Sequence, residues 1–179
     1  MVDLRLVQAS PDNGLMKRLI AEWDRQIVAQ RYPKEVLDAI RRYEAELKPD
    51  KTYGVYVLCR QGEGGIGHSP YEAFVHINHA HPKSNKPILR LIWSRLAPKY
   101  EWVADPVEEH SRIFSSVVYS AAELAKNDLK SSEVKIYLLS RADRSFGKRF
   151  ATALTGATLP FTVSARGNWL HLAMRNEQS

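Results

Sequence analysis

The feature that most constrains the fold of this 179-residue chain is a helix pattern lying between two apolar strand patterns. Residues 88–96 are rich in Leu, Ile and Trp, which is typical of a central strand. In residues 133–139, Val134, Ile136 and Leu138 alternate within an apolar run. A connecting helix carries the chain back across the sheet, so we expect these strands to pair in parallel through a right-handed crossover. This unit predicts an α/β fold.

The crossover helix has a clear predicted start. Asp105 is expected to be its N-cap, with Pro106 at the first helical position and Glu108 completing a capping box. The apolar stripe that follows consists of Ile113, Val117, Ala121 and Leu124. We therefore expect a helix that lies flat against a sheet and ends near Asn127.

Strand and helix patterns also flank this unit. Before it we predict a strand at residues 2–7, a helix with Leu15, Leu19, Trp23 and Ile27 on one face, a helix from Pro33 to residue 47, and strands at 53–60 and 71–78. After it we predict a short helix capped by Asp143 and a hairpin of residues 159–164 and 169–174. The Gly-rich residues 61–70 form a long connection and lack a phosphate-loop pattern.

Composition favours one globular domain covering residues 1–179. Apolar residues make up 44% of the chain and charged residues 26%, which argues against disorder. Lys and Arg outnumber Asp and Glu by 26 to 20, giving a formal charge of +6. This excess favours an anionic partner, or it serves solubility. It is spread along the chain without a basic block, so nucleic acid is a minor hypothesis.

The single cysteine and the absence of long apolar runs indicate the cellular compartment in which the protein is expected. Cys59 excludes an intramolecular disulfide and a Cys-based zinc site, which fits a reducing compartment. The N-terminus has no apolar signal core, and no stretch approaches the ~18 apolar residues of a membrane span. We therefore expect a cytoplasmic protein with no membrane partner. The final hairpin and the Gly-rich connection could serve a homodimer.

The order of elements is strand, two helices, three strands, helix, strand, helix and two strands. It resembles the GNAT N-acetyltransferase superfamily over essentially the whole chain. Residues 96–100 (Leu-Ala-Pro-Lys-Tyr) also resemble the family's run of an apolar residue, any residue, Pro, any residue and Tyr. The resemblance implies a GNAT-like mixed, mostly antiparallel sheet with helices on both faces. It also implies an acyl-CoA whose pyrophosphate meets the N-terminus of the following helix, where free N–H groups attract anions.

By this resemblance, the protein uses acetyl-CoA or another acyl-CoA to acetylate an amine on a small molecule or peptide. The residues implied in cofactor binding are Leu96, Ala97, Lys99 and Tyr100. In an alternative register that the sequence leaves open, Arg112 or Lys99 supplies the positive charge and the residues near Glu108 to Ser111 offer their N–H groups. Glu101, Ala104 and Pro106 depart from the family signature, which has Arg or Gln, Gly, and Gly or Ala there. Glu101 adds negative charge and Pro106 removes an N–H group. These departures leave open a non-catalytic GNAT-like module that binds a ligand or a protein.

Amine acetylation needs a group that accepts a proton. Glu72 and His76 are the candidate catalytic residues, because a spacing of four places them on one face of the strand at 71–78. The alternative is an ordinary hydrogen-bonded sheet face. The family's usual Tyr acid has no counterpart in the short helix, which carries Phe146 and Phe150. His79 and His81, which lie near His76, would share a face if the strand continued. However, Pro82 ends the segment and no nearby carboxylate is fixed by spacing, so no metal is expected.

Overall fold

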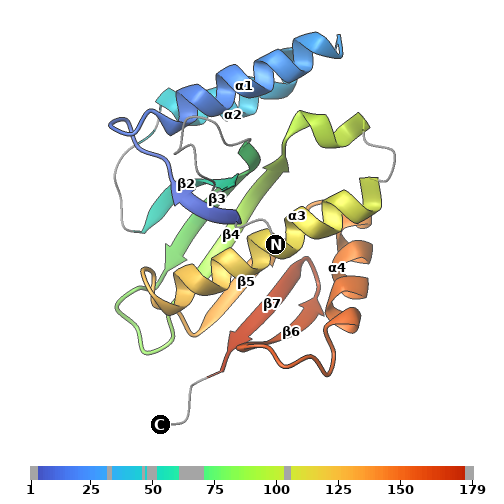
Figure 1. The fold of residues 1–179 in the computed structure, drawn as a ribbon. Helices are drawn as coiled ribbons and strands as arrows, with labels where there is room; N and C mark the ends of the chain where they lie inside the picture. Colours follow the sequence, from blue (N-terminus) through green and yellow to red (C-terminus); the bar gives the residue numbers. More distant parts are fainter. Residues whose placement is uncertain are drawn as a thin grey trace. The chain divides into compact units, whose positions relative to one another are not determined.

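The computed structural model describes residues 4–31, 34–45, 47, 52–60, 71–102 and 106–175. They fall into two compact units, one of residues 1–76 and 94–120 and one of residues 77–93 and 121–179. The strands are β1 (Leu4–Gln8), β2 (Tyr53–Arg60), β3 (Tyr71–Ala80), β4 (Ile88–Leu96), β5 (Glu133–Tyr137), β6 (Phe161–Arg166) and β7 (Trp169–Met174). The helices are α1 (Leu15–Ala29), α2 (Asp38–Ala45), α3 (Pro106–Lys126) and α4 (Arg141–Ala153), with 3₁₀ helices η1 (Lys34–Leu37) and η2 (Pro98–Trp102) (Figure 1).

The predicted fold class is confirmed. The strands follow the order β1-β2-β3-β4-β5-β7-β6 in a seven-stranded sheet. β4 and β5 pair in parallel from Ile88 opposite Glu133 to Leu91 opposite Ile136, as the crossover pattern predicts. The β1–β2, β5–β7 and β6–β7 pairs are antiparallel, so the α/β fold has a mixed, mostly antiparallel sheet. The prediction of a single domain stays a prediction.

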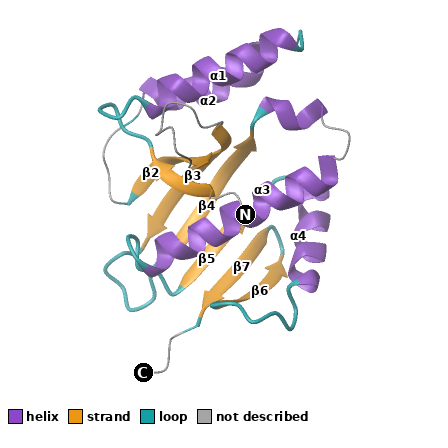
Figure 2. Ribbon diagram, viewed as in Figure 1, coloured by secondary structure: helices purple, strands orange, loops and turns teal. Residues whose placement is uncertain are grey.

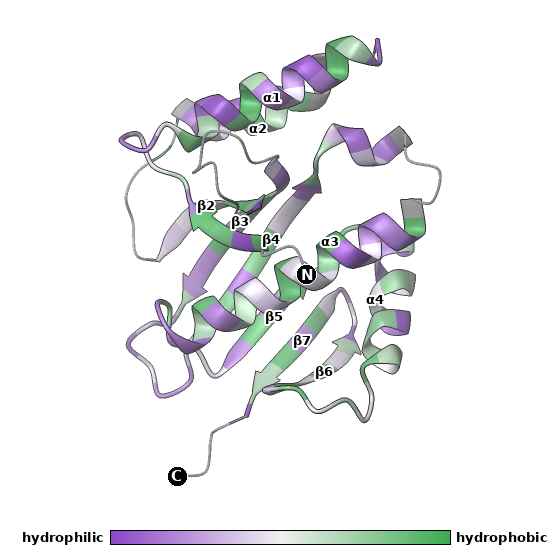
Figure 3. Cartoon of the chain, in the orientation of Figure 1, coloured by the Kyte–Doolittle hydropathy of each residue, from purple (hydrophilic) through white to green (hydrophobic). Residues whose placement is uncertain are grey.

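In the first unit, α1 packs through the face that its sequence predicts. Leu15, Leu19, Trp23 and Ile27 are buried, and Figure 3 shows hydrophobic bands alternating with hydrophilic ones along this helix. The indole Nε1 of Trp23 donates to the backbone carbonyl of Tyr71 at 2.9 Å, which ties α1 to the start of β3. α2 lies beside α1 (Figure 1). Strand β3 is therefore held in place by a buried contact at its first residue.

Two helix starts differ from the sequence-based predictions. The segment after α1 forms η1 before α2 begins at Asp38, whereas a continuous helix from Pro33 was expected; Pro33 lies outside the described residues. The N-cap of α4 is Ser140 rather than Asp143. Ser140 Oγ accepts from the Asp143 N–H, and the Asp143 carboxylate accepts from the Ser140 N–H. Asp143 is therefore the third-position member of a capping box. The predicted cap Asp105 lies outside the described residues.

In the second unit, α4 packs against β6 and β7 (Figure 2). The predicted hairpin between these strands is confirmed, with its turn at Gly167 and Asn168. Gly167 has a φ of 57°, which a glycine adopts without steric cost. A two-residue hairpin turn with glycine at its first position requires such a positive φ. None of the helices that the structure describes combines the length and the apolar character needed to cross a membrane.

Candidate active site

A fully buried carboxylate lies at the centre of the candidate site. The Glu72 side chain, on β3, has no exposed surface. Lys99 Nζ lies 2.7 Å from Glu72 Oε2, and Arg60 Nη2 lies 3.2 Å from Glu72 Oε1. Tyr100 Oη donates a short hydrogen bond to Oε2. Burying a charge is costly unless it is paired and hydrogen-bonded, so these three donors make the position tenable.

The backbone after β4 brings two of these donors to Glu72. The Ala97 N–H donates to the Glu72 carbonyl at 2.9 Å, and the chain then turns through η2. The Tyr100 N–H closes that turn on the Ala97 carbonyl at 3.0 Å. Gln26 Oε1, from α1, accepts from the Lys99 N–H at 3.1 Å. Lys99 and Tyr100 are therefore placed by backbone contacts to a strand and a helix distant in sequence.

Arg112, on α3, extends the cluster. Its Nη2 lies 3.4 Å from Tyr100 Oη and 2.7 Å from Glu109 Oε2. The contact with Glu109 raises the pKa of Arg112, and burial followed by the bond to Glu72 raises the pKa of Tyr100. Tyr100 therefore stays a protonated donor at neutral pH.

The cations of this cluster remain partly open to solvent. The side chains of Arg60, Lys99 and Arg112 are 39%, 33% and 40% exposed. These three cations outnumber the carboxylates of Glu72 and Glu109, so the cluster keeps one net positive charge. Glu72 therefore orients cations whose outer sides can contact an anionic ligand.

His76 lies further along β3 in an aromatic environment. Its side chain is 5% exposed, and the rings of Tyr43 and Tyr53 lie 4.9 Å and 4.3 Å from its own. Tyr43 Oη is 3.3 Å from Nδ1, while Nε2 is buried without a hydrogen-bond partner in the part of the chain that is described. Burial lowers the pKa of His76, so its imidazole is neutral at pH 7.

The lowered pKa predicts a loss of stability in mild acid. Because the unfolded chain binds a proton near pH 6.5 and the folded imidazole resists it, the free energy of unfolding falls as pH drops below 6.5 toward the folded pKa. One such proton contributes at most about 1.4 kcal/mol per pH unit. Urea denaturation from neutral pH to about 5.5 should show this slope, and a His76→Gln variant should lose part of it. Equal slopes in the two proteins would contradict the prediction.

The structure brings together residues to which the sequence analysis assigned two different roles. Glu72, taken as catalytic, contacts Lys99 and Tyr100, taken as cofactor-binding, and Arg112 contacts Tyr100. His76, in contrast, lies four residues further along β3, and its Nδ1 contacts the hydroxyl of Tyr43. The structure thus contains a charged cluster and a separate buried imidazole.

The remaining predicted residues differ in what they offer a ligand. Leu96 is half-buried at the end of β4, and the Ala97 side chain is fully buried. Ser111 Oγ donates to the Val107 carbonyl at 2.7 Å, so its proton is used within α3. Glu101 lies 3.4 Å from Arg95, and Ala104 is outside the described residues.

Sequence reasoning missed Arg60 and Tyr43. Arg60 is a charged residue at the end of an apolar strand, and that position could have drawn attention to it. Tyr43 lies within the helix predicted from Pro33 to residue 47, and that prediction did not reveal that its hydroxyl reaches His76. His79 Nε2 lies 3.3 Å from the Lys130 carbonyl. Within the described residues, no group of three or more His, Cys, Asp or Glu side chains is arranged to hold a metal ion.

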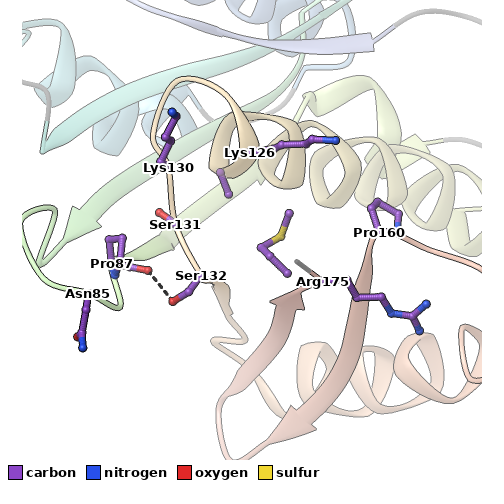
Figure 4. Close-up of a pocket in the computed structure, with 10 residues that line it drawn as sticks. Asn85, Pro87, Lys126, Lys130, Ser131, Ser132, Pro160 and Arg175 are labelled. Carbon is purple, nitrogen blue, oxygen red and sulfur yellow. Dashed lines mark hydrogen bonds between the residues drawn. The ribbon is translucent and has the colours of Figure 1, made fainter. Parts of the chain in front are cut away.

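A pocket of about 610 Å³ lies in the second unit. It is lined by Asn85, Pro87, Ala125, Lys126, Lys130, Ser131, Ser132, Pro160, Met174 and Arg175. Figure 4 shows the Lys130 ammonium on one side of it and the Arg175 guanidinium on the other, so these charges do not converge on one point. Ser132 Oγ is hydrogen-bonded to the Pro87 carbonyl at 3.2 Å (Figure 4). Among the described residues, the lining contains no carboxylate or imidazole that could accept a proton from a substrate.

Comparison with known proteins gives matches to solved structures alone. No protein-family model and no curated protein matches the chain. A putative GNAT-family acetyltransferase from Desulfovibrio desulfuricans is 14% identical over 99% of both chains, with a TM-score of 0.43. An acetyltransferase from Thermus thermophilus is 13% identical over 98% of this chain and 99% of its own, with a TM-score of 0.41. AtaT complexed with acetyl-methionyl-tRNA is 10% identical over 75% of both chains, with a TM-score of 0.42.

The order of strands and helices in the structure is the GNAT-like order that the sequence predicts. The prediction of a GNAT-like fold is therefore confirmed.

Proposed function

We propose that this protein is an acyl-CoA-dependent N-acyltransferase that transfers an acetyl group to an amine. The observation that carries the proposal is the cluster in which the buried Glu72 holds Arg60, Lys99 and Tyr100 directly after β4. Residues 96–100 are also the segment where the GNAT resemblance expects the acyl-CoA. A net positive cluster at this place fits an anionic cofactor.

In this proposal, the cations bind the phosphates of the cofactor. Arg112 and Arg60 present planar guanidinium groups that suit phosphate oxygens, and Lys99 adds a point charge. Glu72 is a positioning residue, because its carboxylate is buried and fixes the direction of these side chains. The bound acyl-CoA supplies a thioester, whose carbonyl is the group that an amine attacks.

His76 is proposed to accept the proton that the attacking amine releases. Its imidazole is neutral, and when Nδ1–H donates to Tyr43 Oη, the lone pair of Nε2 is free to take a proton. The new amide bond forms as the carbon–sulfur bond breaks and the thiolate leaves. Glu72 and His76 are four residues apart, about 13 Å along a strand. This separation suits a cofactor whose phosphates and thioester lie at opposite ends of its pantetheine arm.

A second candidate is a non-catalytic module of the same fold that binds an anionic ligand or a protein. It is favoured because the charged groups of the cluster already pair with one another. Lys99 and Tyr100 are bound to Glu72, and Arg112 is bound to Glu109. Glu101, which follows Tyr100 in the chain, is paired with Arg95 at 3.4 Å and supplies no positive charge for a phosphate. The two candidates differ in whether bound acetyl-CoA is turned over.

Calorimetric titration with CoA and acetyl-CoA tests the proposed cofactor site. Lys99→Met and Arg112→Met should each weaken binding about tenfold or more, because each removes a charged hydrogen-bond donor. Arg25→Met is the matched control, since that side chain is 77% exposed on α1 and pairs with Glu22. Unchanged affinity in both cluster variants would place the cofactor elsewhere. No binding of either ligand would reject the acyltransferase.

A further inference from the structure

One face of the sheet in the second unit carries polar and aromatic side chains rather than a core. Along β5, Val134 and Ile136 are buried while the alternate residues are half-exposed, and β7 repeats this pattern around Leu170 and Leu172. Figure 3 shows the corresponding change between hydrophobic and hydrophilic residues along β7. Gly147 of α4 lies against Leu138, so α4 packs on the buried face.

Strand pairing brings the half-exposed residues into two rows. In one row, Arg90 lies opposite Lys135, which lies opposite His171. In the next row, Tyr137 lies opposite Trp169, which lies opposite Arg166. The rings of Tyr137 and Trp169 meet edge to face at 5.0 Å. We call these six residues, Arg90, Lys135, Tyr137, Arg166, Trp169 and His171, the basic-aromatic face.

The charge of this face is positive. Glu133 lies 3.3 Å from Lys135 and 2.5 Å from His171, so it offsets part of that row. The side chains of Arg90 and Arg166 have no hydrogen bond or ion pair with any residue that the structure describes, and Arg166 is exposed. The three cations Arg90, Lys135 and Arg166 exceed the one carboxylate, Glu133, by two charges. The face thus combines unneutralised guanidinium groups with two adjacent aromatic rings.

We propose that the basic-aromatic face binds single-stranded nucleic acid. Trp169 and Tyr137 offer ring surfaces on which bases stack. Lys135 lies one strand spacing from Arg90 and two from Arg166, so the three cations cross the sheet where backbone phosphates would pass. A second copy of the chain suits this face poorly, because a two-fold interface would set the net positive charge of the face against the same charge on the other copy. A duplex keeps its bases stacked inside, so the aromatic pair favours a single strand. The proposal does not depend on the acyltransferase activity.

Fluorescence anisotropy with a labelled oligodeoxythymidylate of about 16 nucleotides tests this proposal. The wild-type chain should bind it, with a slope of log affinity against log salt of about −2 for three phosphate contacts. Arg166→Ala should reduce that slope by about 0.7. Trp169→Ala should weaken binding about tenfold, and Trp169→Phe, which keeps a ring, should restore most of it. Arg25→Ala, on α1, should change nothing.

Three results would overturn the proposal. They are the absence of binding at about 50 mM salt, equal binding of a duplex of the same length, and binding that persists unchanged in Arg166→Ala. Arg166 is the exposed last residue of β6, so its variant should remain folded. The Arg166→Ala result therefore keeps the test decisive if Trp169→Ala unfolds. A dimer or a captured protein that covers the face in place of the oligonucleotide would also count against it.

Discussion

Glu72→Gln is expected to lower the free energy of unfolding by about 3 kcal/mol, the usual size of the effect when one partner of a buried ion pair is removed. The amide keeps the volume but loses the charge that holds Lys99 and Arg60, and it places an NH₂ group near their own donors. For a chain of this size, the melting temperature should fall by roughly 6–12 °C. Urea denaturation and thermal melting measure both quantities.

Glu22→Gln is the matched control for this substitution. Glu22 pairs with Arg25 at 2.7 Å, but Arg25 is 77% exposed, so the loss should be below about 1 kcal/mol. A Glu72→Gln protein as stable as this control would mean that the carboxylate is not what holds the cluster together.

His76→Asn is expected to have the largest effect on activity. If Nε2 accepts the amine proton, the rate of acetyl transfer should fall about 10²- to 10⁴-fold, with little change in the affinity for acetyl-CoA. The rate of CoA release with an amine that the wild type acetylates measures this loss. Tyr43→Phe should retain most of the activity with an altered pH profile, because it removes the hydroxyl next to Nδ1 while keeping the ring.

His79→Asn is the matched control on the same strand, since the His79 ring lies against the backbone carbonyl of Lys130, with Nε2 3.3 Å from that oxygen. A wild-type rate in His76→Asn, or an equal loss in His79→Asn, would remove His76 from the mechanism.

Sequence patterns predicted the elements with long periodicity and missed contacts made by distant segments. The stripe of α1 and the parallel pairing of β4 with β5 follow from local spacing, and both are confirmed. The N-cap of α4 was misplaced because Ser140 and Asp143 both carry side chains that can cap a helix. Only the two reciprocal hydrogen bonds between them show that Ser140 is the N-cap.

The sequence predicted several residues of the candidate site, but it did not predict which of them contact one another. Lys99 and Tyr100 reach Glu72 through a 3₁₀ turn and a backbone bond between segments 25 residues apart, from Glu72 to Ala97. Arg60 joins them from another strand, and its position at the end of an apolar strand does not reveal that it pairs with Glu72. Nε2 of His76 has no hydrogen-bond partner among the described residues because α2 and β2 cover the ring, and spacing along β3 cannot reveal that cover.

The measurement that tests the central claim most directly is the melting temperature of the purified protein during titration with acetyl-CoA. If the cluster around Glu72 binds the cofactor, ligand at about a hundred times its dissociation constant should add roughly 2.7 kcal/mol to the free energy of unfolding and raise the melting temperature. The rise should shrink in Lys99→Met. No rise at millimolar acetyl-CoA would contradict the acyltransferase proposal and leave a fold that serves another ligand.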